Sequence, residues 1–228
     1  MMERESVGIK GIDSMLDGGL PQSGIFGLSG PPGVGKSIFC LHYLLAGARK
    51  GQKCVYINLE EPIENIYRMI EQFEFGNEFK KYLKTNRVVL KCYTYSEFEK
   101  IQGELLKKIK EENDTERLVL DSFNGFFNYI YMPETNVGGI NARRTINQVF
   151  SNMRRENLTT VLTIEKDTNC PGLNYNLPFL VDGMIQFDFL DIGTIERRVF
   201  IKKMRWTNQS RDSKDFDINY KGISVLEE

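Results

Sequence analysis

The octapeptide at residues 30–37 constrains this chain more than any other feature. Its sequence is Gly30-Pro31-Pro32-Gly33-Val34-Gly35-Lys36-Ser37, which matches the phosphate-binding pattern G-x-x-x-x-G-K-[ST] at every required position. The apolar run before it, residues 23–29, predicts a buried strand, and the apolar residues after it recur at helical spacing. A glycine-rich loop between a strand and a helix predicts an α/β fold organised around a phosphate site.

The residue types in this loop suit a nucleoside triphosphate. Glycines let the backbone wrap around phosphates with its N–H groups pointing inward, and the helix that follows directs its positive end toward them. Lys36 is expected to neutralise the β- and γ-phosphates, and the Ser37 hydroxyl is expected to join the coordination shell of Mg²⁺. We therefore expect residues 30–38, through Ile38, to form the nucleotide-binding loop.

Length, charge and cysteine content limit the number of domains and the classes of ligand that this chain is expected to have. The 228 residues suit one α/β domain, and a net charge of −1 gives no global sign of nucleic-acid binding. The four cysteines form no C-x-x-C pair and the only histidine is His42, so a zinc site is not expected. The chain contains neither a signal peptide nor a run of about 18 apolar residues, so we expect a cytoplasmic protein without membrane contact.

Several further segments resemble one family. Residues 7–21 read V-G-I-K-G-I-D-S-M-L-D-G-G-L-P before the strand and the phosphate loop, which looks like the KaiC-like branch of the RecA/RadA ATPases. The stretches V-D-G-M-I at 181–185, K-K-M-R-W-T at 202–207 and F-D-I-N-Y-K-G-I-S-V at 216–225 are similar to the same family. The resemblance covers residues 7–226, and within the family the chain looks close to archaeal RadA paralogues.

The resemblance implies an architecture and a cofactor. We expect a RecA-like P-loop NTPase fold in one domain over residues 1–228, with residues 1–22 as a lead-in segment. A central, mostly parallel β-sheet should be flanked by helices and followed by antiparallel strands near the C-terminus. ATP and Mg²⁺ are the implied cofactors.

Glu60 and Glu61 follow the second predicted strand, residues 53–59. Carboxylates at the carboxyl edge of a parallel sheet can orient water on a γ-phosphate. Acids beside Pro62 can equally complement the dipole of a helix predicted at 63–75. KaiC-like ATPases carry a catalytic Glu-Glu pair at this place, so the resemblance favours the catalytic role without separating the two residues.

Asp121 ends the apolar strand predicted at 117–122. A carboxylate at that strand end is expected to hold Mg²⁺, commonly through water, opposite Ser37. Ser122 resembles the polar residue that follows this Asp in the family and assists nucleotide sensing. Glu165, at the end of the strand predicted at 160–164, is a lesser candidate that either reaches the attacking water or contacts Lys166 or Arg143.

Lys203 and Arg205 alternate on a predicted strand, residues 196–204, so that both point to one face. Family members assemble as rings with nucleotide between neighbours, and the resemblance implies that these two residues reach the γ-phosphate of the next subunit. The alternative is an edge strand that displays cations to solvent. Arg211 is a weaker candidate, and Trp206 is expected either to stack on adenine or to make an apolar interface contact.

Two stretches are expected to be irregular loops, residues 126–139 and 166–176. In RecA-like proteins, loops at these positions line the ring channel and contact single-stranded DNA, although the two stretches hold few cations, and apolar packing of Phe126 and Phe127 is the alternative. Helices are predicted at 96–112 and 140–156. The second carries four arginines, for which a solvated face or a subunit contact remains open: Arg143, Arg144, Arg154 and Arg155.

These features predict an ATP-hydrolysing, homo-oligomeric ring, such as a hexamer, in which Lys36, Glu60, Glu61, Lys203 and Arg205 are the catalytic candidates. The resemblance to RadA paralogues adds modulation of DNA recombination or repair, with single-stranded DNA or a recombinase as partner. The competing hypothesis is a nucleotide-gated signalling or scaffold protein with slow or absent hydrolysis and no DNA binding. Phosphotransfer to the chain's own Ser or Thr and a small-molecule kinase have less support.

Overall fold

The computed structural model describes residues 3–94, 97, 114–130, 140–166, 177–191 and 193–226, without the side chains of 127–130, 140–143 and 145. The described helices are α1 (Lys10–Met15), α2 (Lys36–Arg49), α3 (Ile63–Glu71), α4 (Gly76–Lys84), α7 (Phe123–Ile130) and α8 (Ile140–Arg155). The described strands are β1 (Arg4–Glu5), β2 (Leu20–Pro21), β3 (Ile25–Gly30), β4 (Cys54–Asn58), β5 (Val88–Cys92), β6 (Arg117–Asp121), β7 (Thr159–Glu165), β8 (Gly183–Asp191), β9 (Ile195–Met204), β10 (Lys214–Asn219) and β11 (Gly222–Val225).

Nine of these strands form one sheet in the order β11-β10-β9-β8-β3-β7-β6-β4-β5. The strands from β8 to β5 run parallel, whereas β9, β10 and β11 pair antiparallel. This is the mostly parallel sheet with antiparallel C-terminal strands that the sequence predicts. Because β3, β4, β6 and β7 are parallel neighbours, the loops after them open on the same edge of the sheet.

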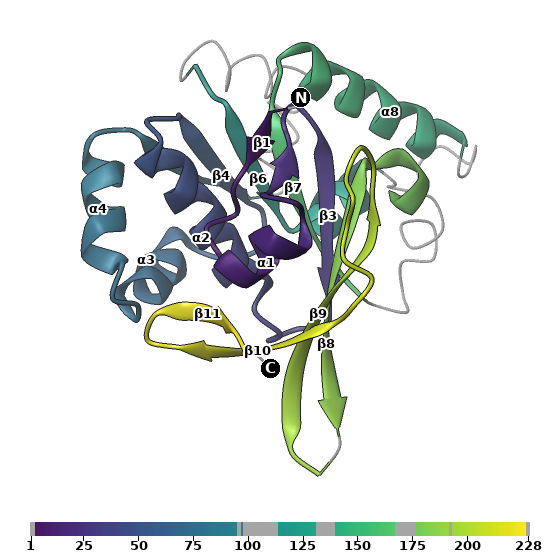
Figure 1. The fold of residues 1–228 in the computed structure, drawn as a ribbon. Coiled ribbons are helices and arrows are strands. Elements are labelled where there is room, and N and C mark those ends of the chain that lie inside the picture. Colours follow the sequence, from purple (N-terminus) through teal and green to yellow (C-terminus); the bar gives the residue numbers. More distant parts are fainter. Residues whose placement is uncertain are drawn as a thin grey trace.

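Apolar side chains form a core on each face of the sheet. Within β6, Val119 packs toward the side that holds α1 to α4, while Leu118 and Leu120 pack toward α7 and α8. This alternation follows from the two-residue period of a strand that is buried on both faces. Figure 1 shows the resulting layers, with α8 on the opposite side of the sheet from α2, α3 and α4.

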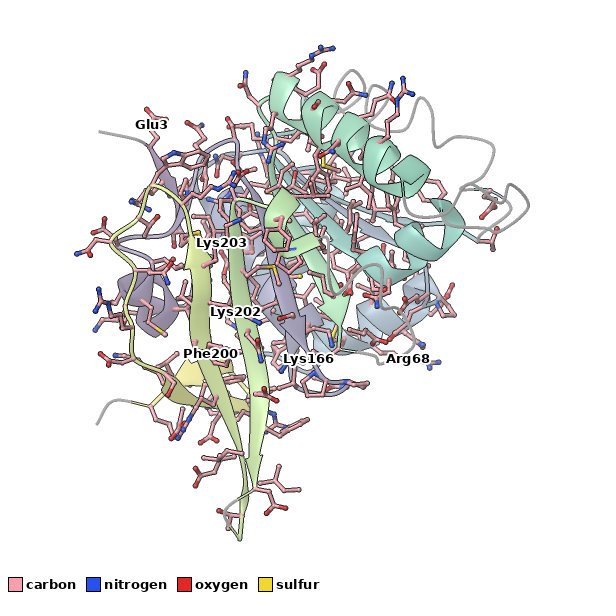
Figure 2. All side chains as sticks on the ribbon, turned by 90° about the vertical axis from the view of Figure 1, so that its right-hand side faces the viewer. Glu3, Arg68, Lys166, Phe200, Lys202 and Lys203 are labelled. Carbon is pink, nitrogen blue, oxygen red and sulfur yellow. The ribbon has the colours of Figure 1, made fainter. Side chains whose placement is uncertain are left out.

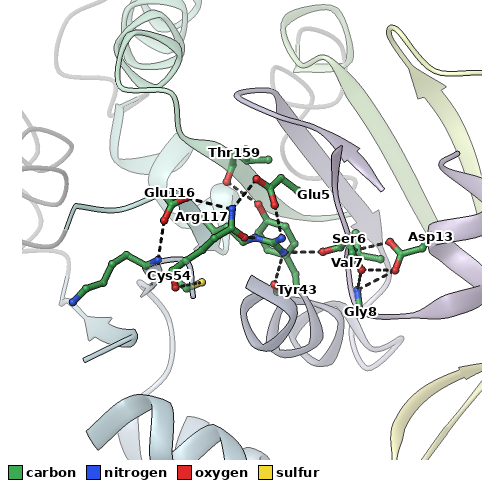
Figure 3. Close-up of polar contacts among 12 residues, drawn as sticks. Glu5, Ser6, Val7, Gly8, Asp13, Tyr43, Cys54, Glu116, Arg117 and Thr159 are labelled. Carbon is green, nitrogen blue, oxygen red and sulfur yellow. Dashed lines mark hydrogen bonds and ion pairs between the residues drawn. The ribbon is translucent and has the colours of Figure 1, made fainter. Parts of the chain in front are cut away.

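The lead-in segment is fixed to the sheet by a buried charge network (Figure 3). Arg117 is fully buried at the start of β6, where its guanidinium pairs with the Glu5 carboxylate and donates to the carbonyls of Ser6 and Tyr43 at 2.7 and 2.8 Å. Asp13 accepts hydrogen bonds from the Ser6 hydroxyl and the Val7 amide, both at 2.7 Å. A buried charge needs such partners, so this network fixes where residues 5–13 lie.

Three predicted boundaries differ from the structure. Residues 126–130, predicted to begin an irregular loop, belong to helix α7. Phe126 is buried against Phe123 with ring centroids 5.3 Å apart, so the packing alternative is correct for Phe126. The helix predicted at 63–75 ends at Glu71, and a further helix, α4, follows it. The stretch from Asp13 to Asp17, which a glycine pair and Pro21 follow, predicts a short helix, whereas the observed helix α1 runs from Lys10 to Met15. Apart from Glu97, the predicted helix at 96–112 lies outside the described residues, as do the loops at 131–139 and 167–176.

Candidate functional site

A cavity of about 330 Å³ lies at the carboxyl edge of the parallel strands. Five parts of the chain build its wall: the loop after β3 with the start of α2, the end of β4 with the turn after it, the end of β6, the end of β7, and helix α3 through Ile66 and Met69. The predicted site residues that line it are Pro32, Gly33, Gly35, Lys36, Ser37, Ile38, Glu60, Glu61, Asp121 and Glu165. Residues predicted separately from four points of the chain therefore meet around one volume.

The phosphate loop needs glycine at two of its positions for reasons visible in the structure. Gly35 has φ +111°, and a Cβ there would approach Ile218 Cδ1 of β10 to 2.8 Å. A Cβ at Gly30 would meet the carbonyl oxygen of Phe187 on β8 at 2.7 Å. The turn into α2 is thus packed tightly against strands from the C-terminal part of the chain, which is why the backbone keeps this shape.

Lys36 is buried at the first position of α2. Its ammonium donates to the carbonyls of Gly30 and Pro31 at 2.9 and 3.0 Å. Burial lowers the pKa of Lys36, while the carboxylates of Glu165 and Asp121 act in the opposite direction. A charged amine held inside a glycine loop beside carboxylates is suited to receive phosphate oxygens.

Asp121 is oriented by two hydroxyl groups on neighbouring strands. Tyr56 on β4 donates to Asp121 Oδ2, and Thr163 on β7 donates to Asp121 Oδ1. Burial raises the pKa of Tyr56, so its hydroxyl stays protonated and remains a donor. Ser37 also hydrogen-bonds Tyr56, which connects the two predicted metal-binding residues.

Glu60 and Glu61 are presented by a short turn that Asn58 organises. The Asn58 side-chain oxygen accepts hydrogen bonds from the backbone N–H groups of Glu60 and Glu61 at 2.7 and 2.8 Å. Only the Glu60 carboxylate accepts a hydrogen bond from Ser122 among the bonds found in the described part of the chain. Burial of its carboxyl end raises the pKa of Glu60, and the nearby carboxylates of Glu165, Asp121 and Glu61 add to that rise, although the residue as a whole is open to solvent.

Glu165 has its backbone clamped by Asn124 on α7. The Glu165 N–H donates to Asn124 Oδ1 at 2.8 Å, and Asn124 Nδ2 donates back to the Glu165 carbonyl at 3.3 Å. Its side chain lines the cavity, and Lys166 pairs instead with Asp188 at 2.7 Å. The proposed Glu165–Lys166 contact is therefore absent from the described interactions, and Glu165 faces the same volume as Glu60.

Four polar residues at this site were not predicted from the sequence: Tyr56, Asn58, Asn124 and Thr163. Three of them occupy strands close to the carboxyl edge, where a polar side chain inside an apolar run is unusual and needs a partner. Their place in the sequence could have indicated a role at the site, because Asn58 directly precedes the loop of Glu60 and Thr163 lies two residues before Glu165.

Lys203 and Arg205 do not reach this cavity. The Lys203 ammonium donates to the carbonyls of Pro178 and Val181 at 2.9 and 2.6 Å, and Arg205 pairs with Asp182 at 3.3 Å. Lys203 pairs in register with Met184 at the beginning of β8, the edge opposite the phosphate loop. Figure 2 shows Lys203 and Lys166 well separated along the strands.

Arg154 on helix α8 is not the simple solvent-exposed cation that one of the two predictions for this helix describes. Its guanidinium pairs with buried Asp182 at 3.0 Å and donates to the Leu180 carbonyl at 3.2 Å, so it is not merely a solvated cation. Arg144 and Arg155 are exposed, and the Arg143 side chain lies outside the described ones. Trp206 is 57% exposed, as a surface contact would require. Arg154 and Arg205 therefore both form ion pairs with the carboxylate of Asp182.

Comparison with known proteins places this geometry in a family. The family model described as "ATPase: KaiC" matches residues 6–228. The chain belongs to the KaiC family of ATPases. A UPF0273 protein of Thermotoga maritima is 30% identical, with 99% of this chain and 96% of that protein covered, and a UPF0273 protein of Pyrococcus furiosus is 28% identical, with 99% and 94% covered.

A solved KaiC-like protein from Pyrococcus horikoshii OT3 has the same fold, with a TM-score of 0.80, 25% identity and both chains covered completely. The KaiC-family assignment confirms the predicted RecA-like α/β class. Among the helices that the structure describes, none is both long enough and apolar enough to cross a membrane.

Proposed function

We propose that this KaiC-family protein binds ATP with Mg²⁺ and hydrolyses it at the cavity on the carboxyl edge of the sheet. The observation that carries the proposal is the convergence of Lys36, Asp121 and Glu60 on one volume of about 330 Å³. These three groups supply a cation for phosphates, an oxygen ligand for a metal and a carboxylate for water. Together they are the minimum set that P-loop hydrolysis requires.

The oxygen donors of the site fit a magnesium ion. Asp121 and Ser37 offer hard oxygen ligands, and Mg²⁺ bound to ATP supplies neutralisation of charge on the β- and γ-phosphates. Tyr56 and Thr163 each use one lone pair of an Asp121 oxygen and leave a further one for a metal-bound water. Binding of the triphosphate would draw the Lys36 ammonium from the Gly30 and Pro31 carbonyls to phosphate oxygens.

Glu60 is the better candidate of the two glutamates for positioning the attacking water. Its carboxylate is anchored by Ser122 and lies near the carboxylates of Glu165 and Asp121. A raised pKa brings a carboxylate closer to the range in which it accepts a proton during catalysis. Glu61 shares the Asn58 turn, but within the described part of the chain no hydrogen bond anchors its side chain as Ser122 anchors that of Glu60.

We further propose that the working form is a homo-oligomeric ring in which Lys203 and Arg205 serve the neighbour's nucleotide. Phe26 of β3 pairs with Gly183, and Gly183 pairs with Met204, whereas the phosphate loop begins at Gly30. Gly30 lies four residues beyond Phe26 along β3, so Met204 and the start of the phosphate loop are about 13 Å apart along the strand direction. The two cations therefore have no route to the chain's own γ-phosphate, and a role there requires a second copy.

The glutamate pair gives the test of hydrolysis. The variant with both Glu60→Gln and Glu61→Gln should retain Mg²⁺-dependent ATP binding, measured by calorimetry, and lose phosphate release by at least about 100-fold. Unchanged phosphate release would refute the water-positioning role. Binding without turnover in the unmodified protein would favour the alternative function, a nucleotide-gated signalling or scaffold protein.

Modulation of recombination or repair, and closeness to RadA paralogues, stay predictions of the sequence. The loops on which DNA contact depends lie largely outside the described residues. A salt-dependent titration with single-stranded DNA tests the idea, because phosphate contacts strengthen as the salt concentration falls. Absence of binding at low salt would remove it.

A further inference from the structure

A second cavity, of about 410 Å³, lies between α1, the C-terminal half of α2 and the β10–β11 hairpin. Figure 1 shows β11 beside α1 on the α2 side of the sheet. Both His42 and Arg49 line it from α2. They follow Lys36 by 6 and 13 residues, which places them about 9 and about 20 Å along the helix from the phosphate loop. This volume is therefore separate from the nucleotide cavity.

Cations from three other segments line this cavity: Lys10 from α1, Lys214 from β10 and Lys221 from the turn after β10. No described carboxylate forms an ion pair with any of these three lysines. Arg49, the fourth cation, is already held by Glu78 through bonds of 2.9 and 2.6 Å. Glu74 is the single acidic residue in the wall. The wall therefore carries an excess of uncompensated positive charge.

Apolar side chains make up part of the cavity lining. Ile9, Leu45 and Phe75 contribute buried side chains, and the ring of His42 meets Phe75 edge-on with centroids 5.1 Å apart. His42 is uncharged there, because burial lowers its pKa to about 4, and its Nε2 accepts a hydrogen bond from the Ile223 amide at 3.1 Å. A cavity lined by both apolar side chains and lysines matches a ligand that has an organic body and an anionic end.

From this arrangement we propose that the cavity binds a phosphorylated organic molecule, with phosphate at the lysines and an apolar or aromatic part on Phe75 and Leu45. Lysine ammonium groups bind phosphate as point charges, and one phosphate monoester carries about −1.5 to −2 at neutral pH. That charge balances the excess of the three lysines over Glu74. The volume lies within the range of roughly 300 to 1,000 Å³ that small-molecule sites occupy. The proposal does not depend on ATP hydrolysis.

The first experiment uses phenyl phosphate, inorganic phosphate and phenol as probes in protein that carries Lys36→Ala, so that the phosphate loop does not compete. Chemical shifts of backbone amides report where each probe binds. Phenyl phosphate should shift the amides of Gly8, Gly11 and Ser224, which line the cavity, and should bind more tightly than either inorganic phosphate or phenol. Shifts confined to residues 30–37, or equal affinity for all three probes, would overturn the proposal.

A charge variant makes the test specific. Lys214→Ala combined with Lys221→Ala should weaken phenyl phosphate binding roughly tenfold, because two charge-assisted contacts are removed. Lys202→Ala is the matched control, since Lys202 is an exposed lysine on β9 outside the cavity wall, and it should leave the affinity unchanged. Equal affinities in the double variant and the control would contradict the proposal. So would binding of an acidic peptide in place of phenyl phosphate.

Discussion

Ser122 donates its hydroxyl hydrogen bond to the Glu60 carboxylate and so joins the end of β6 to the loop after β4. This bond distinguishes Glu60 from Glu61, which the sequence leaves equivalent. It also places the glutamate next to Asp121, the residue that precedes Ser122 and is linked to it by a cis peptide bond. Because Glu60 and Glu61 differ in their contacts, their roles can be tested with single substitutions.

The two single glutamate variants should differ. Glu60→Gln should lower kcat for ATP hydrolysis by about 100-fold or more, because it removes the anchored carboxylate, whereas Glu61→Gln should cost less than about tenfold. Steady-state phosphate release measures both. Ser122→Ala should lie between them, since it removes only the anchor. A larger loss in Glu61→Gln than in Glu60→Gln would reverse the assignment.

The hydroxyl groups around Asp121 should control the magnesium requirement. In Tyr56→Phe and Thr163→Val, the Asp121 carboxylate loses one oriented donor each, so the Mg²⁺ concentration for half-maximal activity should rise several-fold while ATP affinity without metal stays the same. A magnesium titration of phosphate release measures the effect. If both variants require the same Mg²⁺ concentration as the unmodified protein, these hydroxyls serve packing alone.

Mixed subunits test whether Arg205 acts on a neighbour. Arg205→Ala alone should lower turnover by about 1,000-fold, in the range of arginines supplied in trans. Mixing it with Lys36→Ala protein should restore part of the activity, because an interface then forms between an intact phosphate loop and an intact Arg205. Light scattering with and without Mg²⁺·ATP should detect the oligomer. A strict monomer in both conditions would rule out the trans role.

The lowered pKa of His42 predicts that the free energy of unfolding changes between pH 6.5 and about 4. Its folded pKa of about 4 lies below the ordinary value of 6.5, so the unfolded chain binds the extra proton as the pH falls through this window. The free energy of unfolding should therefore decrease on acidification, by roughly 3 kcal/mol at most. His42 is the only histidine in the chain. Denaturant unfolding of His42→Gln should show a flatter pH dependence over this window, and an unchanged slope would contradict the explanation.

Much of the site could be predicted because its motifs are local. Lys36, Ser37, Glu60 and Asp121 are placed by short patterns at strand ends, and parallel strands bring those ends to one edge. Helix α4 is not among the predicted helices, although Phe79, Tyr82 and Leu83 recur at helical spacing and pack against the core, so this signal was available in the sequence. For residues 126–130 of α7, the aromatic-rich composition disfavours a helix, and packing of this helix against α8 overrides that local preference.

Long-range contacts escaped prediction for a different reason. Tyr56 and Thr163 reach Asp121 from two other strands, and their partnership depends on strand order rather than on any local pattern. The same holds for Arg154 and Arg205, which meet at Asp182 from a helix and a strand end 51 residues apart in the sequence. Such contacts are set by tertiary packing, which sequence periodicity does not encode.

The central claim is that the phosphate loop binds ATP with Mg²⁺, and calorimetric titration of Mg²⁺·ATP into the protein tests it most directly. The unmodified chain should bind one ATP per subunit, Lys36→Ala should lose at least about 100-fold in affinity, and Lys50→Ala, an exposed lysine just beyond the end of α2, should bind as the unmodified chain does. Equal ATP affinity in Lys36→Ala and Lys50→Ala would contradict the assignment of this loop as the nucleotide site.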